Sequence, residues 1–339
     1  MIRRVLAAAV TLALAALLLV ACWPQLLGLQ QAMGVAQLVS LRGMAALVAV
    51  LLAVLLTLFA LLSHRTRRFF AGLAVLLLGF AVVSTGVLAV RGFGGGAFQT
   101  TADGDLVVLS WNTLGDVPGT ATIAQLADEV EADVVALPET SHAAGEAVQA
   151  ALAASGRPMQ LIDLQLDEIS KARSTVLLIS TRLGEYRRDD TVGSTPTLPS
   201  VVAVPVDHSG PTIVAAHPVA PVAGEMRNWR DGLGWLADRC TDPDADVIVA
   251  GDLNSTLDHW AGYGSDAGLA ACGDVARAVG AAAVGTWPTL LPPLLGAPID
   301  HVLATGSWEP IGFRVIESED GAGSDHRPVL AQLRPASGS

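Results

Sequence analysis

The sequence predicts an α/β protein in which three membrane-spanning helices precede a sandwich of two mixed β-sheets with helices on the outside. Two observations support this fold class. The first 91 of the 339 residues contain three long apolar segments and no acidic residue. The rest of the chain alternates short apolar strands with amphipathic helices, a pattern typical of a mixed α/β domain.

Three N-terminal segments have the composition of transmembrane helices. Residues 5–22, 43–63 and 69–90 carry no charged side chain, and each is about as long as a helix that crosses a hydrocarbon core of ~30 Å. We therefore expect residues 1–91 to form a membrane region. The first segment has two alternatives, the apolar region of a signal peptide or a lipoprotein processing site that lipidates Cys22.

Arginine residues predict the orientation of this region. Arg3 and Arg4 precede the first segment, and the sequence HRTRR at 64–68 joins the second segment to the third. Because three spans place these two clusters on the same side, the positive-inside rule makes that side cytoplasmic. The domain that follows is then expected on the extracellular face of the membrane, next to the lipid bilayer.

The C-terminal part of the chain is strongly acidic. All 32 acidic residues and 13 of the 20 basic residues lie in 92–339, which gives this part a formal net charge of −19. A surface this negative repels a polyanion at long range, so nucleic acid is not an expected partner. Its two cysteines, Cys240 and Cys272, could form a disulfide in an exported domain or remain two small buried thiols.

The organisation of this part follows from its apolar pattern. Residues 92–104 are rich in glycine and predict a linker, and residues 105–335 predict a single domain. The expected helices are 122–132, 142–155 and 228–240. The expected strands are 106–112, 133–140, 174–180, 201–207, 212–218, 247–250, 299–305, 313–317 and 328–333.

Polar side chains recur where these apolar strands begin or end. Each one alone could be a capped turn or a satisfied core residue, but their joint occurrence favours a catalytic centre. Carboxylate and amide oxygens suit Mg²⁺ or Mn²⁺, and histidines beside such an ion can supply an acid, a base and a phosphate clamp. The candidate residues are Asn112, Glu139, His217, Asp252, Asn254, Asp300, Asp325 and His326.

The sequences around these residues resemble an ordered set of family motifs. SWNTL, ALPET, AAHPVAP, AGDLNST, PIDHVL and GSDHRP look like those of the endonuclease/exonuclease/phosphatase superfamily, over about residues 106–333. GDLN followed later by SDH is specific as a pair, although neither is specific alone. The resemblance implies the four-layer α/β sandwich of the DNase I-like fold and a Mg²⁺- or Mn²⁺-dependent phosphoric ester hydrolase.

The resemblance also implies a role for the acidic and amide residues. Glu139 would be the principal metal carboxylate, with Asn112 beside it and Asp325 near the ion. Asp252 would orient or deprotonate the attacking water. Asn254 would steady the phosphate in the transition state.

For the two histidines, the resemblance implies contacts with phosphate. His326 would contact the scissile phosphate, with its ring held by Asp300. His217 would clamp the phosphate or act as the leaving-group acid. Two departures from nuclease members are Pro138, where many carry Gln, and Leu114, where abasic-site endonucleases carry an acidic residue.

The three spans indicate a substrate at the membrane surface. The layout and the HPVAP segment are similar to the actinobacterial VanJ-type membrane proteins linked to glycopeptide resistance, which implies a bacterial cytoplasmic membrane. We expect a phosphorylated, lipid-linked substrate such as undecaprenyl pyrophosphate. The apolar loop 281–298 would contact lipid or pack on its own domain. The alternatives are an extracellular nuclease or phospholipid phosphodiesterase, and a non-catalytic membrane protein with a partner-binding ectodomain.

Overall fold

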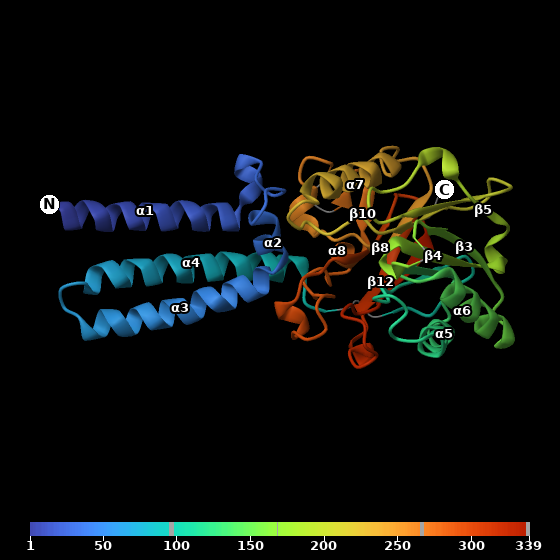
Figure 1. Ribbon diagram of the computed structural model, residues 1–339, viewed down its shortest axis with the longest axis horizontal. Coiled ribbons are helices and arrows are strands. Elements are labelled where there is room, and N and C mark those ends of the chain that lie inside the picture. Colours follow the sequence, from blue (N-terminus) through green and yellow to red (C-terminus); the bar gives the residue numbers. More distant parts are fainter. Residues whose placement is uncertain (95–97, 168, 265–267, 337–339) are drawn as a thin grey trace.

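Three long helices project from one side of a β-sandwich (Figure 1) in the computed structural model, which describes residues 1–94, 98–167, 169–264 and 268–336. By length and composition, each of the three could cross a membrane. They confirm the three predicted helices, with starts that differ by one to three residues, and are α1 (Ile2–Cys22), α3 (Arg42–Leu62) and α4 (Arg67–Arg91). The linker predicted at 92–104 includes residues 95–97, which lie outside the described residues.

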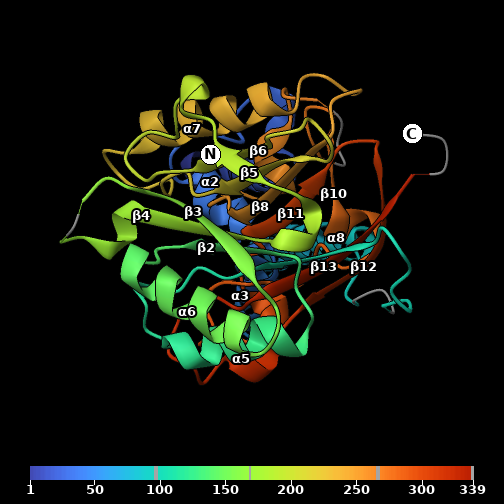
Figure 2. The same cartoon turned by 90° about the vertical axis from the view of Figure 1, so that its right-hand side faces the viewer.

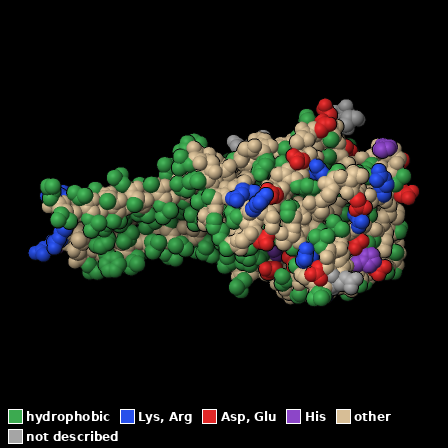
Figure 3. Space-filling view, turned by 45° about the horizontal axis from the view of Figure 1, so that its top comes forward, with side chains coloured by type: hydrophobic (Ala, Val, Ile, Leu, Met, Phe, Trp, Pro, Cys, Tyr) green, Lys and Arg blue, Asp and Glu red, His purple; other side chains and the backbone are tan. Residues whose placement is uncertain are grey.

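Small side chains lie at the contact between the candidate membrane helices α3 and α4. Ala49 and Ala53 of α3 share one buried cluster with Ala74 and Ala81 of α4. In lipid the hydrophobic effect does not drive helices together, so close approach through small residues supplies the packing. Large apolar side chains therefore face outward, and the space-filling view shows them covering the projection (Figure 3).

A short connector between α1 and α3 rests on the sandwich. It contains the turn η1 (Pro24–Leu27) and the helix α2 (Val35–Ser40), which the sequence did not predict. Gln31 Nε2 donates to the carbonyl of His259 at 2.9 Å, and His259 Nε2 lies 3.1 Å from the Ala36 carbonyl. Hydrogen bonds therefore join the connector to the segment that follows the strand β8 (Val247–Asp252).

The sandwich consists of two mixed sheets. The first has the order β12-β13-β1-β2-β4-β3 and the second the order β5-β6-β7-β8-β11-β10-β9. The first sheet contains β1 (Leu106–Ser110), β2 (Val134–Pro138), β3 (Met159–Gln165), β4 (Ser174–Ser180), β12 (Trp308–Val315) and β13 (Val329–Pro335). The second contains β5 (Tyr186–Arg188), β6 (Val201–Pro205), β7 (Thr212–Ala216), β8 (Val247–Asp252), β9 (Gly268–Leu269), β10 (Cys272–Asp274) and β11 (Asp300–Ala304).

Helices cover both outer faces, which confirms the predicted four-layer sandwich. In the end-on view (Figure 2), α7 lies over one sheet and α5 and α6 lie under the other. Buried aliphatic side chains fill the space between the sheets, and separate apolar clusters join each sheet to its helices. The helices are α5 (Thr120–Glu129), α6 (His142–Ala154), α7 (Met226–Arg239) and the short α8 (Val275–Ala278).

The fold brings two pairs of parallel strands together at the same edge. β1 pairs in parallel with β2, and β7 pairs in parallel with β8. Because parallel neighbours end at the same edge, the residues that follow these four strands lie side by side. This edge faces the connector between α1 and α3, as the contacts of His259 show.

A disulfide joins Cys240, after α7, to Cys272 on β10 and closes a loop with a sequence separation of 32 residues. Both half-cystines are fully buried. Of the two alternatives that the sequence left open, the structure shows the bridge. Cys22 is a free thiol at the end of α1, and its lipidation remains one of the alternatives that the sequence left open.

We expect the double substitution Cys240→Ala with Cys272→Ala to lower the free energy of unfolding by about 3 kcal/mol, because the bridge restricts the unfolded chain. Unfolding of the detergent-purified protein by denaturant measures the change. A reductant should destabilise the wild-type protein and leave the double variant unaffected. Equal sensitivity of both proteins to the reductant would contradict a stabilising bridge.

Candidate active site

Eight predicted residues gather at the shared edge of the two sheets. Asn112 follows β1 and Glu139 follows β2, whereas His217 follows β7 and Asp252 ends β8. One hydrogen bond joins the two sheets here, from Asn112 Nδ2 to Asp252 Oδ2 at 3.1 Å. The remaining residues, Asn254, Asp300, Asp325 and His326, contact or adjoin this group.

Asp252 is buried at the centre of the group. Its Oδ2 accepts hydrogen bonds from Asn112 and from Asn254 Nδ2, each at 3.1 Å, and its Oδ1 accepts from the backbone N–H of Asn254 at 2.8 Å. Gly251 makes this position possible, because a Cβ there would lie 2.0 Å from the Ala216 carbonyl oxygen. The close approach of β7 and β8 therefore fixes where the carboxylate points.

His326 forms a buried pair with Asp300. Its Nδ1 lies 2.9 Å from Asp300 Oδ2, and its Nε2 faces Asp252 Oδ2 at 3.7 Å. Asp300 is held in place because it stands opposite Asp252 in the β8–β11 register. Burial lowers the pKa of His326, but the charges of Asp300 and Asp252 outweigh it and raise the pKa well above its usual value.

The pKa of the Asp252 carboxyl is shifted upward. Burial is the main cause, the positive charge of His326 opposes it, and the negative charge of Asp300 adds to it. A carboxylate whose pKa lies closer to neutrality is a stronger base than an exposed one. This environment suits proton transfer from water.

His217 is fully buried, and neither ring nitrogen has a hydrogen-bond partner among the described residues. Its Nε2 lies 3.6 Å from Glu139 Oε1. Burial, and secondarily the charge of His326, lower the pKa of His217 to about 3. The ring is therefore neutral at pH 7 and can donate one hydrogen bond to a ligand in the pocket.

The predicted metal ligands Asn112, Glu139 and Asp325 present two carboxylates and one amide. Asn112 Nδ2 donates to Glu139 Oε1 at 3.0 Å, while its Oδ1 accepts from the backbone N–H of Leu114. The amide must rotate before its oxygen can face an ion. Glu139 has a left-handed backbone, with φ of 55°, a conformation that is uncommon outside glycine and concentrated at functional sites.

The donor set fits a divalent cation. Asp325 Oδ1 and Asp300 Oδ1 are buried without a hydrogen-bond partner among the described residues. A second group of potential ligands, Asp252, Asp300 and His326, has atoms within 4.8 Å of one another. Because hard oxygen atoms predominate, the residues suit Mg²⁺ or Mn²⁺.

Two residues that the sequence analysis did not select support the site. Trp287 donates from Nε1 to Asp325 Oδ2 at 2.8 Å. Ser324 donates to the Asn112 carbonyl at 2.7 Å and accepts from the His326 backbone N–H. Trp287 belongs to the apolar loop 281–298, whose polar function could not be inferred from its composition.

This loop packs on its own domain, one of the two alternatives expected for it. Buried Arg327 donates to the carbonyls of Thr289 and Leu291. The loop also touches the start of α3. The Leu294 carbonyl oxygen lies so close to Gly43 that a Cβ added to this glycine would be 2.0 Å from it. Contact with lipid remains a prediction.

A cavity of about 450 Å³ opens over the site. Part of its polar wall consists of Glu139, His217, Asp252, Asn254 and His326. The connector before α3 contributes a second wall with Gln37, Ser40 and Leu41, and the remaining lining is mostly apolar: Leu198, Val219, Ala220, Pro221, Val222, Trp287, Ala297 and Ile299. The connector between the candidate membrane helices α1 and α3 therefore forms part of the pocket.

Solved structures support the fold. An endonuclease/exonuclease/phosphatase from Beutenbergia cavernae DSM 12333 is 20% identical, with a TM-score of 0.50 over 68% of this chain and 72% of that one. D. rerio TDP2 in complex with a single-strand DNA product is 19% identical, and D. rerio TDP2 humanized by 14 mutations is 17% identical. For both, the TM-score is 0.51 over 68% of this chain and 100% of theirs. At these identities the likeness shows the fold alone.

Comparison with curated proteins finds no match, and the resemblance to VanJ-type proteins remains a prediction. Residues 109–326, more than half of the chain, match the model of the endonuclease/exonuclease/phosphatase family. The chain therefore belongs to the endonuclease/exonuclease/phosphatase family of phosphoric ester hydrolases.

Proposed function

We propose that this protein is a membrane-anchored, Mg²⁺- or Mn²⁺-dependent phosphoesterase that hydrolyses a phosphate ester or pyrophosphate carried by a membrane lipid, such as undecaprenyl pyrophosphate. The observation that supports this proposal is the composition of the pocket. Its walls combine Asp252 and His326 with apolar side chains and with the connector between two candidate membrane helices. A polar headgroup and an apolar chain would both find complementary surfaces.

The site residues divide the chemistry between them. Asp252 accepts a proton from the attacking water, whose oxygen forms a bond to phosphorus while the bond from phosphorus to the leaving oxygen breaks. The leaving oxygen keeps the bonding electron pair and takes up a proton from water. His326, positively charged beside Asp300, donates a hydrogen bond to a phosphoryl oxygen. Asn254 holds the Asp252 carboxylate through two hydrogen bonds and steadies the phosphate, while neutral His217 acts as a phosphate clamp.

Glu139 and Asp325 are the residues we assign to the metal, with Asn112 as a third ligand once its amide has rotated. The group of Asp252, Asp300 and His326 is less suitable, because the imidazole is positively charged and already hydrogen-bonded to Asp300. A bound divalent cation would neutralise negative charge on the phosphoryl oxygens.

Action on nucleic acid or on phospholipids as a phosphodiesterase remains an alternative within the same chemistry. The charge of −19 in residues 92–339 opposes binding of a polyanion. A non-catalytic, partner-binding ectodomain is the other alternative, and a residue-by-residue test of activity separates it from an enzyme.

A phosphate-release panel tests the proposed activity. The full-length protein in detergent should release phosphate from an isoprenoid pyrophosphate in the presence of Mg²⁺ or Mn²⁺, and a chelator should abolish release. Asp252→Asn should lower kcat about 10²–10⁴-fold, because the base is lost. Asp238→Asn, an exposed change on α7, is the matched control. Efficient cleavage of DNA with no lipid turnover, or full activity of Asp252→Asn, would refute the proposal.

The apolar wall makes a separate prediction about the lipid chain. Val222 lines the pocket and is 51% exposed, so Val222→Ser should leave the fold intact. It should raise KM about ten-fold for a long-chain substrate, because two methyl groups no longer contact the chain. KM for a short-chain, water-soluble analogue should stay unchanged. The control is Val206→Ser, which is similarly exposed at the end of β6, and equal effects on both substrates would argue against a lipid-chain contact.

The proposed orientation places the sandwich outside the cell. Arg3 and Arg4 at the start of α1 and Arg67 at the start of α4 lie at the end of the projection farthest from the sandwich (Figure 1), which is the cytoplasmic end by the positive-inside rule. A reporter that is active only outside the cytoplasm should be active when fused after residue 104 and inactive when fused after residue 64. The reverse pattern would exclude this orientation.

A further inference from the structure

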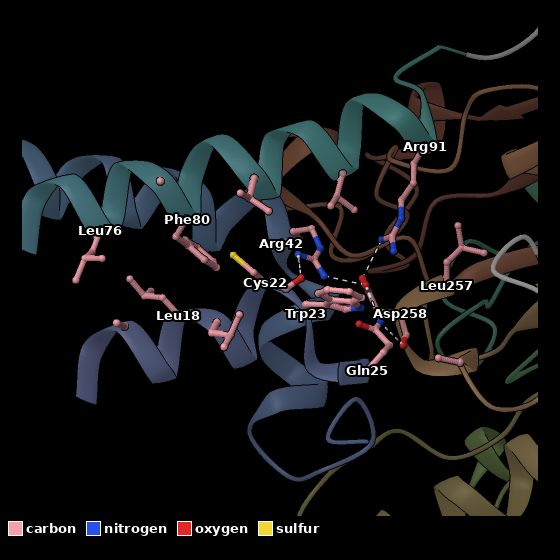
Figure 4. A pocket seen from close by; sticks show the side chains of 16 residues that line it. Leu18, Cys22, Trp23, Gln25, Arg42, Leu76, Phe80, Arg91, Leu257 and Asp258 are labelled. Atoms are coloured by element: carbon pink, nitrogen blue, oxygen red, sulfur yellow. Dashed lines mark hydrogen bonds and ion pairs between the residues drawn. The ribbon is translucent and has the colours of Figure 1, made fainter. Parts of the chain in front are cut away.

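A second cavity, of about 700 Å³, lies away from the catalytic pocket, between the candidate membrane helices α1 and α4. Figure 4 shows Leu18 of α1 opposite Leu76 and Phe80 of α4, with side chains that point into the gap. At the end nearest the sandwich, Arg42 and Arg91 point toward Asp258. The cavity is thus apolar along its length and charged at one end.

The charged end carries an excess of positive charge. Arg42 Nη2 and Arg91 Nη1 each lie 2.8 Å from a different oxygen of Asp258, and among the described residues Asp258 is the only carboxylate that lines the cavity. Residues 1–91 contain no acidic residue that could balance the second arginine. Arg42 is 3% exposed, and its Nε has no partner among the described residues. Two guanidinium groups that share one carboxylate leave one positive charge unbalanced, which is costly where the charges are buried.

The dimensions match one leaflet of a bilayer. From Arg91 back to Leu76, helix α4 rises about 22 Å, and half of a bilayer that is ~40–45 Å thick with its headgroup regions is about 20–22 Å. Arg91 ends α4, Arg42 begins α3, and Trp23, which follows α1, is 57% exposed beside them. Tryptophan and arginine are typical of the headgroup level, so the apolar part of the cavity lies at the depth of lipid chains.

We propose that this cavity binds one anionic phospholipid of the leaflet next to the sandwich, with a chain along Leu18, Leu76 and Phe80 and its phosphate at Arg42 and Arg91. A phosphodiester carries one negative charge, which equals the excess of two guanidinium groups over one carboxylate. A zwitterionic phospholipid would add a positive group of its own, so that the charge at this end of the cavity would remain unbalanced. This site is separate from the proposed catalytic pocket and does not depend on the substrate.

The test is lipid binding to the full-length protein in detergent, measured by native mass spectrometry with phosphatidylglycerol and phosphatidylcholine. One phosphatidylglycerol should bind about ten-fold more tightly than phosphatidylcholine. Arg91→Gln should remove this preference, because the remaining pair of Arg42 and Asp258 is neutral. The matched control is Arg68→Gln, an exposed change at the opposite end of α4, which should bind as the wild-type protein does.

A second variant keeps every charge. A Cβ at Gly79, which lines the cavity, would have no neighbour within 4 Å, so Gly79→Leu should fill the cavity without disturbing the helix packing. It should weaken phosphatidylglycerol binding about ten-fold, because the leucine side chain occupies the space that the acyl chain would fill. Gly72→Leu, equally open on the same helix and outside the cavity, is its control.

Three results would overturn the proposal. The first is equal affinity for the two phospholipids, and the second is unchanged binding by both Arg91→Gln and Gly79→Leu. The third is displacement of phosphatidylglycerol by an isoprenoid phosphate at lower concentration, which would assign the cavity to a different lipid. Because binding is measured without a substrate, an inactive enzyme would not affect any of these results.

Discussion

The junction between the membrane helices and the sandwich depends on one buried carboxylate. Asp258 binds Arg42 of α3 and Arg91 of α4 and is almost completely buried. Burial alone would raise the pKa of the Asp258 carboxyl, but the two guanidinium groups hold it well below its usual range. Removal of one partner of a buried pair costs about 3–5 kcal/mol. Apolar contacts alone would let the helices slide along the sandwich, whereas these hydrogen bonds hold α3 and α4 at fixed positions.

The same short segment connects this junction to the candidate site. Asp252 stands six residues before Asp258, and Asn254, with φ of 45°, turns the chain between them. His259 follows, fully buried, with Nδ1 accepting from the Thr256 N–H and Nε2 facing the Ala36 carbonyl of α2. Because so few residues separate these contacts, the membrane helices and the wall of the pocket cannot move independently of β8.

The sequence predicted the layers because each strand and helix has a recognisable apolar pattern. It predicted the eight polar residues because carboxylates, amides and histidines stand at the ends of the apolar strands. It missed β3, whose MQLIDLQ sequence mixes polarity at a sheet edge, and β5, which spans only three residues. It did not reveal the role of Asp258 and His259 at the junction, because their partners lie more than 150 residues away in sequence. Gln37 and Leu41 were missed for the same reason: only tertiary structure brings the connector to the pocket.

The charges of the candidate site favour binding of a cation. The site contains one positively charged imidazole, that of His326, and the pKa of His217 leaves its ring neutral. Its carboxylates are Asp252, Asp300 and Asp325, which lie next to His326, and Glu139, which lies next to His217. The excess negative charge repels a phosphate, and the acidic sandwich adds to the repulsion. A divalent cation held by Glu139 and Asp325 would cancel two of the three excess negative charges. Under the proposed function, metal binding would therefore favour entry of an anionic headgroup into the pocket, in addition to any effect on the rate of hydrolysis.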